Sequence, residues 1–164
     1  MTPSRDHRKA DTWRKLRFES IADCKADVER ILAADQQGIL QSCGNWTAGQ
    51  ILSHIAAWIE YAYEGYPIKA PPFFIRWILK IGLRKMLEHG MSKGVRIPGI
   101  KEGTTGMEDV PTAQAADRLI AALNRLAKDD AIKEPSPAFG SMSHQDRIKL
   151  NLRHAELHLG YLSY

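Results

Sequence analysis

Three histidines have a spacing that could hold a metal ion. His154 and His158 lie four residues apart in the closing stretch RHAELHLGYLSY (153–164), and His54 lies in GNWTAGQILSHIAAW (44–58). Successive residues of an α-helix are about 100° apart around its axis, so His154 and His158 would project from one side of one helix. Two imidazoles at i and i+4 can bind one ion, and a third from a neighbouring helix completes a face of the coordination shell.

The same geometry predicts that the three histidines face the protein interior. In the last helix the histidine pair falls within a broad apolar arc, and His54 lies among the isoleucines, alanines and aromatic residues of its own helix. A buried imidazole without a partner costs about 1–3 kcal/mol, so each needs one. The charged residues that fall outside these arcs, and are expected to point outward, include Glu60, Glu64, Arg153 and Glu156.

Two interpretations of the histidines follow. Three protein ligands leave a position for water or substrate, which is typical of a catalytic zinc site. Alternatively, the histidines are hydrogen-bonded core residues, because a chain with six histidines contains an i, i+4 pair by chance reasonably often. Since the acidic residues point outward, a carboxylate-bridged centre with two metal ions is not expected.

Other side chains on the same helix faces are candidates for lining the pocket or supporting the ligands. Each also has an ordinary role, such as helix capping for the glutamine and core packing for the aromatic residues. The three remaining histidines are not assigned to the site, and His144 is excluded because ten helical residues from His154 span about 15 Å. The pocket candidates are Gln50, Trp58, Tyr61, Asn151 and Tyr161.

Four segments have the periodicity and start signals of helices long enough to position these residues. They are 21–37 after Ser20, 48–64 after Thr47, a segment that follows Pro111 and Thr112, and a segment from Ser143 almost to the end. No stretch alternates with the period of a strand. The sequence therefore predicts an all-α four-helix bundle, with residues 65–111 as a long crossover that carries a short extra helix at about 73–89.

Composition indicates one globular domain over residues 1–164, with residues 1–12 as a flexible tail. Hydrophobic residues make up 44% and charged residues 26% of the chain. The start has no apolar signal region, and basic residues interrupt the longest apolar stretch, so we expect no signal peptide and no membrane span. A cytoplasmic protein with its two cysteines reduced is expected.

Positive charge is concentrated in two zones. Residues 1–17 hold six Lys and Arg, and residues 76–101 hold seven. Such zones can attract nucleic acid or another anionic partner, but most are solvated surface, so nucleic acid is not expected. Within 73–89, a basic stripe borders a wide apolar face. Membrane-surface binding, nucleic-acid binding, a lid or a subunit interface are alternatives, and packing against the bundle or a second copy in a homodimer is the expectation.

Two stretches of the chain resemble a known superfamily. The stretches 44–58 and FGSMSHQDRIKLNLRHAELHLGYL (139–162) resemble the DinB-like damage-inducible bacterial proteins, which include bacillithiol- and mycothiol-dependent transferases. More narrowly, RKLRFESIADCKADVERIL (14–32) and PAFGSMS (137–143) resemble one of its families of unknown function.

The resemblance implies a bundle with up-down-down-up order and a divalent metal ion. Zinc and nickel are the expected metals. One histidine of the second helix and a His-x-x-x-His pair of the fourth would hold the ion, and these correspond to His54, His154 and His158. The metal would activate a low-molecular-weight thiol or a water toward a small-molecule substrate, as a thiol S-transferase or a hydrolase. The alternative is a non-catalytic, stress-related bundle that acts as a binding or dimerisation module.

Overall fold

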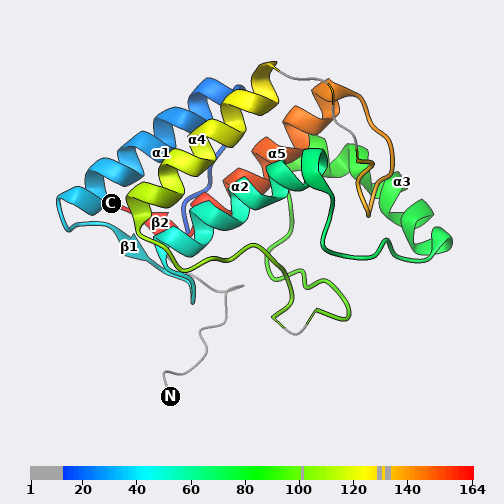
Figure 1. Ribbon diagram of the computed structural model, residues 1–164, viewed down its shortest axis with the longest axis horizontal. Coiled ribbons are helices and arrows are strands. Elements are labelled where there is room, and N and C mark those ends of the chain that lie inside the picture. Colours follow the sequence, from blue (N-terminus) through cyan, green and yellow to red (C-terminus); the bar gives the residue numbers. More distant parts are fainter. Residues whose placement is uncertain (1–12, 101, 129–130, 132–133) are drawn as a thin grey trace.

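The described part of the chain is almost entirely helical in the computed structural model (Figure 1). The structure describes residues 13–100, 102–128, 131 and 134–164, so the predicted tail 1–12 and His7 lie outside the described residues. These residues form five helices and one two-stranded sheet. In chain order the elements are α1 (Ile21–Gln36), β1 (Gln41–Ser42), α2 (Ala48–Glu64), α3 (Phe73–His89), α4 (Thr112–Lys128), α5 (His144–Leu159) and β2 (Leu162–Ser163).

The predicted helix starts are confirmed. Side-chain hydrogen bonds between residues three apart in the sequence fix them. Ser20 and Thr47 each accept a hydrogen bond from a backbone N–H three residues later, and the side chains of Asp23 and Gln50 accept one in return from the cap residue. Such reciprocal bonds satisfy backbone donors that a helix start would otherwise leave unpaired. Ser143 caps α5 through the N–H of Asp146.

The core lies between α1, α2, α4 and α5. Helix α2 packs along α4 and α5, and α1 packs on the same two helices. The chain runs in one direction through α1 and α5 and in the opposite direction through α2 and α4 (Figure 1). The apolar stripes predicted from the sequence meet in this core, whose buried side chains include Val28, Ile31, Ile55, Leu119, Leu123 and Leu152.

The sequence analysis predicts no strands, and this prediction is wrong in one place. Gln41 pairs with Ser163 and Ser42 with Leu162 in a short antiparallel sheet. Two residues are too few to show the alternation by which a strand is recognised. The pairing ties the segment before α2 to the segment after α5, and it brings the first turns of α2 close to the last turns of α5.

The prediction that Arg153 and Glu156 point outward is also wrong. They are 3% and 5% exposed, respectively. Arg153 Nη1 donates to Glu156 Oε1 (2.5 Å) and Nη2 to the Phe18 carbonyl (2.8 Å), and the Phe18 N–H donates to Glu156 Oε1 (2.6 Å). Residues 13–18 therefore cover the side of α5 that helical periodicity assigns to solvent. By contrast, Glu60 and Glu64 lie toward the surface and pair with Arg118 and Arg125.

The same N-terminal segment contacts α1 and the end of the chain. Arg14 forms an ion pair with the buried carboxylate of Asp27 (2.9 Å), and its guanidinium also donates to the Leu159 and Leu162 carbonyls. Trp13 Nε1 donates to the carbonyl of Leu157. The segment thus joins α1 to the last turn of α5.

Helix α3 has the predicted bounds but not the expected packing. It lies beside α5 and extends away from the other four helices (Figure 1). None of its residues is buried, and most of its apolar face is exposed. The expected packing of this face against the bundle is therefore wrong, whereas packing against a second copy in a homodimer stays a prediction. Within the described ranges, no helix is long and apolar enough to cross a membrane.

We predict that Glu156→Ala lowers the free energy of unfolding by about 3–5 kcal/mol, because it leaves the Arg153 guanidinium buried without a counter-charge. The measurement is chemical denaturation followed by circular dichroism. Glu64→Ala is the control, since the Glu64–Arg125 pair is exposed and is expected to contribute less than about 1 kcal/mol. Equal losses in the two variants would contradict a structural role for the buried pair.

Candidate metal centre

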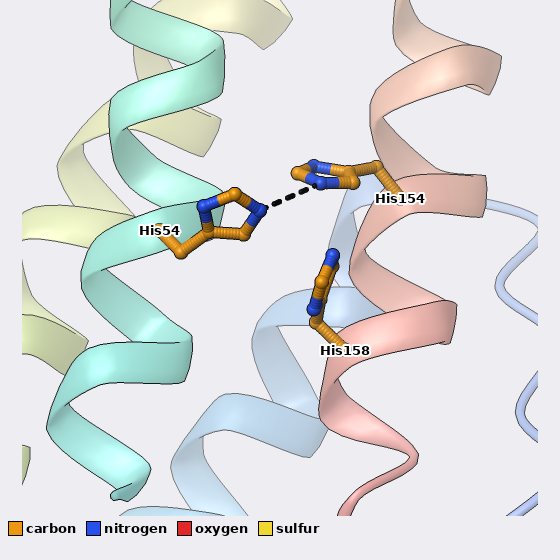
Figure 2. Close-up of side chains that lie close together, drawn as sticks. All are labelled: His54, His154 and His158. Carbon is orange, nitrogen blue, oxygen red and sulfur yellow. Dashed lines mark hydrogen bonds between the residues drawn. The ribbon is translucent and has the colours of Figure 1, made fainter. Parts of the chain in front are cut away.

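The three histidines singled out in the sequence lie together in the structure. His54 projects from α2, and His154 and His158 project from successive turns of α5 toward it (Figure 2). One nitrogen from each lies within 4.8 Å of the other two. His54 Nε2 is 3.1 Å from His154 Nε2, and the ring centroids are 4.5–4.9 Å apart.

A main-chain carbonyl fixes the proton position on His54. Its Nδ1 lies 2.7 Å from the carbonyl oxygen of Thr105. A carbonyl only accepts hydrogen bonds, so Nδ1 carries the proton and Nε2 presents a lone pair. That lone pair is directed toward the α5 histidines (Figure 2). Histidines that bind metals commonly donate their other ring N–H in this way, which sets both the tautomer and the ring orientation.

A glycine allows the Thr105 carbonyl to reach His54. Gly106 has φ +82°, and a Cβ there would lie 2.7 Å from the Ala57 Cβ and 3.2 Å from the Tyr61 hydroxyl. Glycine alone combines this left-handed backbone with such close approach to α2. Sequence reasoning missed Thr105. The available signal was the cluster of glycines in the irregular part of the crossover.

Burial keeps the imidazoles neutral. His54 is 2% exposed, and desolvation lowers its pKa from 6.5 to about 4 despite the opposing hydrogen bond to Thr105. Burial, reinforced by the neighbouring imidazoles, lowers the pKa of His154 and His158 well below 6.5. Both α5 histidines nevertheless retain some exposed surface. At neutral pH the cluster therefore offers uncharged nitrogen ligands that are not fully sealed from solvent.

The spacing of the His54 and His154 nitrogens fits a shared cation. With a lone pair on His54 Nε2, the 3.1 Å approach of His154 Nε2 is favourable only if His154 donates a proton or a cation lies near both. Two nitrogens at 2.0–2.1 Å from one Zn²⁺ with tetrahedral angles are about 3.3–3.4 Å apart. The observed separation is close to that value.

Aromatic rings surround the histidines. Trp46 stacks on His158 with ring centroids 5.5 Å apart and an interplanar angle of 8°, and it meets His54 edge-on. Trp58, a predicted pocket residue, lies 5.9 Å from His154. Tyr61 contacts Trp58 and extends the aromatic group. Sequence reasoning missed Trp46, although it directly precedes the cap residue of the helix that carries His54.

The remaining candidates have other partners. Gln50 completes the capping box of α2, and Asn151 donates to the Arg147 carbonyl. Tyr161 is buried, and its backbone N–H donates to the carbonyl of His158. Among the histidines left unassigned, His89 is exposed at the end of α3 beside Glu88. A pocket role for Gln50, Asn151 and Tyr161 stays a prediction.

Acid is expected to destabilise the metal-free protein through these histidines. Because His54 titrates near 6.5 when unfolded and near 4 when folded, its contribution is complete above pH 6.5 and is lost as pH falls toward 4. The loss amounts to about 3 kcal/mol for this residue. Denaturation with a chelator present, measured across this range, tests the expectation. His54→Gln should reduce the pH dependence and His89→Gln should not; unchanged slopes in His54→Gln would contradict it.

Comparisons with known proteins place the chain in a family. The family model described as "Protein of unknown function (DUF1569)" matches residues 10–163. No curated protein and no solved structure matches the chain. The expectation of a family of unknown function is confirmed. Since the match extends over nearly the whole sequence, the chain belongs to the DUF1569 family.

Proposed function

We propose that the protein is a divalent-metal-dependent enzyme whose ion is held by His54, His154 and His158. The observation that carries the proposal is the convergence of three neutral imidazoles from two helices, one of them held in a single tautomer by the Thr105 carbonyl. The opposite directions of α1 and α5 relative to α2 and α4 support a four-helix bundle of the DinB-like, up-down-down-up type.

Zinc or nickel is the proposed ion, and the donor set is compatible with either. Imidazole nitrogens suit zinc, nickel, copper and iron, whereas magnesium and calcium prefer oxygen ligands. The group within 4.8 Å contains histidines alone. Three protein ligands leave room for an exchangeable ligand, and the partial exposure of His154 and His158 supports access from solvent.

A bound ion would supply an activated water or low-molecular-weight thiol at neutral pH. The proposed reaction is thiol S-transfer to, or hydrolysis of, a small molecule. The residues of the chain then have separable roles: the Thr105 carbonyl orients His54, and Trp46 holds the ring of His158 by stacking. Trp58 presents an apolar surface beside His154, which favours a substrate with an apolar part.

One observation favours a second candidate function. The 3.1 Å separation of His54 Nε2 and His154 Nε2 also suits a hydrogen bond in which His154 donates. The cluster would then be a satisfied polar part of the core, and the protein a non-catalytic binding or dimerisation module. Metal content distinguishes the two functions.

We expect untagged, purified protein to retain about one zinc or nickel ion per chain, measured by elemental mass spectrometry. The double variant His154→Ala, His158→Ala should lose it while keeping its helical circular dichroism spectrum. His89→Ala, which changes an exposed histidine, is the matched control and should retain the ion. Protein that holds no metal, and whose melting temperature does not rise with added Zn²⁺ or Ni²⁺, would rule out the metal-dependent enzyme.

Gly106→Ala should weaken metal binding about 10–100-fold, the usual effect of losing the partner that orients a ligand. The added Cβ cannot fit beside Ala57, so the Thr105 carbonyl must move away from His54. Competition with a chromophoric chelator measures the affinity. Gly99→Ala is the control, because Gly99 has a similar φ of +83° but open space around it. Equal affinities in the two variants would show that the carbonyl does not support the site.

A further inference from the structure

The first three turns of α3 expose an apolar face. Six of the nine large hydrophobic residues that are exposed in the described part of the chain lie in this helix. Phe73 is 83% and Trp77 68% exposed. We use the term outer face for Phe73, Phe74, Trp77, Ile78 and Ile81, which fall within about 140° around the helix axis. A contiguous apolar patch of this kind marks an interaction surface.

The opposite side of α3 attaches the helix to the rest of the protein. Leu79, Leu83 and Leu87 are partly buried, and the helix contacts α5. The outer face therefore points away from the bundle, in keeping with the way α3 extends from the other helices (Figure 1). No segment in the described part of the chain covers it.

Positive charge accompanies the outer face. Lys80, Arg84 and Lys85 are exposed and form no ion pair with another described residue. Residues 65–100 contain seven Lys and Arg and a single acid, Glu88. Lys80 and Arg84 border the outer face along the helix, and Lys85 continues it in the next turn. The surface thus combines aromatic and aliphatic groups with uncompensated cations.

We propose that the outer face of α3 binds the surface of an anionic lipid bilayer, with the helix lying in the plane of the interface. Phenylalanine, tryptophan and isoleucine side chains enter the boundary between headgroups and acyl chains, and lysine and arginine contact the anionic headgroups. The 17-residue helix is about 25 Å long, and it would lie along the surface rather than cross the bilayer.

Charge disfavours a second copy as the occupant. A two-fold symmetric contact would pair the outer face with itself. With two antiparallel α3 helices crossing at Trp77, Arg84 of one copy faces position 70 of the other, next to Lys69. No acidic residue of 65–83 is available to offset this repulsion. An anionic bilayer matches both the apolar and the basic parts of the surface.

The test is co-sedimentation of the full chain with vesicles. We expect binding to vesicles of phosphatidylcholine mixed with phosphatidylserine, and little binding to phosphatidylcholine alone. Lys80→Gln, Arg84→Gln, Lys85→Gln should weaken binding on the order of 100-fold, about fivefold per cation. A control that removes three exposed cations elsewhere, Lys15→Gln, Lys128→Gln, Lys149→Gln, should change it much less.

The apolar part is tested by Trp77→Ser, Ile78→Ser. Neither residue is buried, so the helical circular dichroism spectrum should persist while vesicle binding is lost. Equal binding to both kinds of vesicle, or equal effects of the two triple variants, would overturn the proposal. Two results in protein that does not bind vesicles would also overturn the proposal. One is a dimer, detected by light scattering, that dissociates in this double variant. The other is binding to duplex DNA that persists in this double variant. The proposal is independent of the metal centre, and His154→Ala, His158→Ala should bind vesicles normally.

Discussion

The buried ion pair between Arg153 and Glu156 is the constraint on which the arrangement of α5 depends. Two opposite charges removed from water are tolerated only with good geometry and further hydrogen bonds, and here the backbone of Phe18 supplies them on both sides. Residues 13–18 must therefore dock for α5 to be stable in its position. Helices α1, α2 and α3 contact other parts of α5, so the rotation of α5 about its own axis is closely determined.

That rotation decides where the two α5 histidines point. Arg153 is adjacent to His154 in the sequence, so the side of α5 that binds Phe18 and the side that faces α2 are set together. The β1–β2 pairing joins the segments before α2 and after α5. The ends of the two helices that carry the cluster are thereby held in register, and His54 meets the two α5 histidines although about a hundred residues separate them in the sequence.

Local signals predicted much of this structure. The capping residues Ser20, Thr47 and Ser143 bond to backbone groups only three residues away. They therefore predicted the first residues of α1, α2 and α5 closely. The inward direction of His54, His154 and His158 followed from helical periodicity combined with apolar neighbours. These features depend on residues within one or two helical turns of each other, which is the range over which a single sequence is informative.

The features that the sequence did not reveal depend on contacts between distant segments. The burial of Arg153 and Glu156 requires residues 13–18, which lie more than a hundred positions away. The partner of His54 is a main-chain atom 51 residues along the chain, and a carbonyl group has no sequence signature. The exposure of the outer face of α3 was not predicted for the same reason, because the amphipathic pattern of the helix does not indicate which side meets α5.

The use of a backbone oxygen at position 105 has a consequence for sequence variation among family members. Because every residue type carries that oxygen, selection for the orientation of His54 places little demand on the side chain of position 105. The demand falls instead on its neighbour, where only glycine fits beside Ala57. In homologues that keep this arrangement, an invariant glycine at position 106 would be the evolutionary record of the contact.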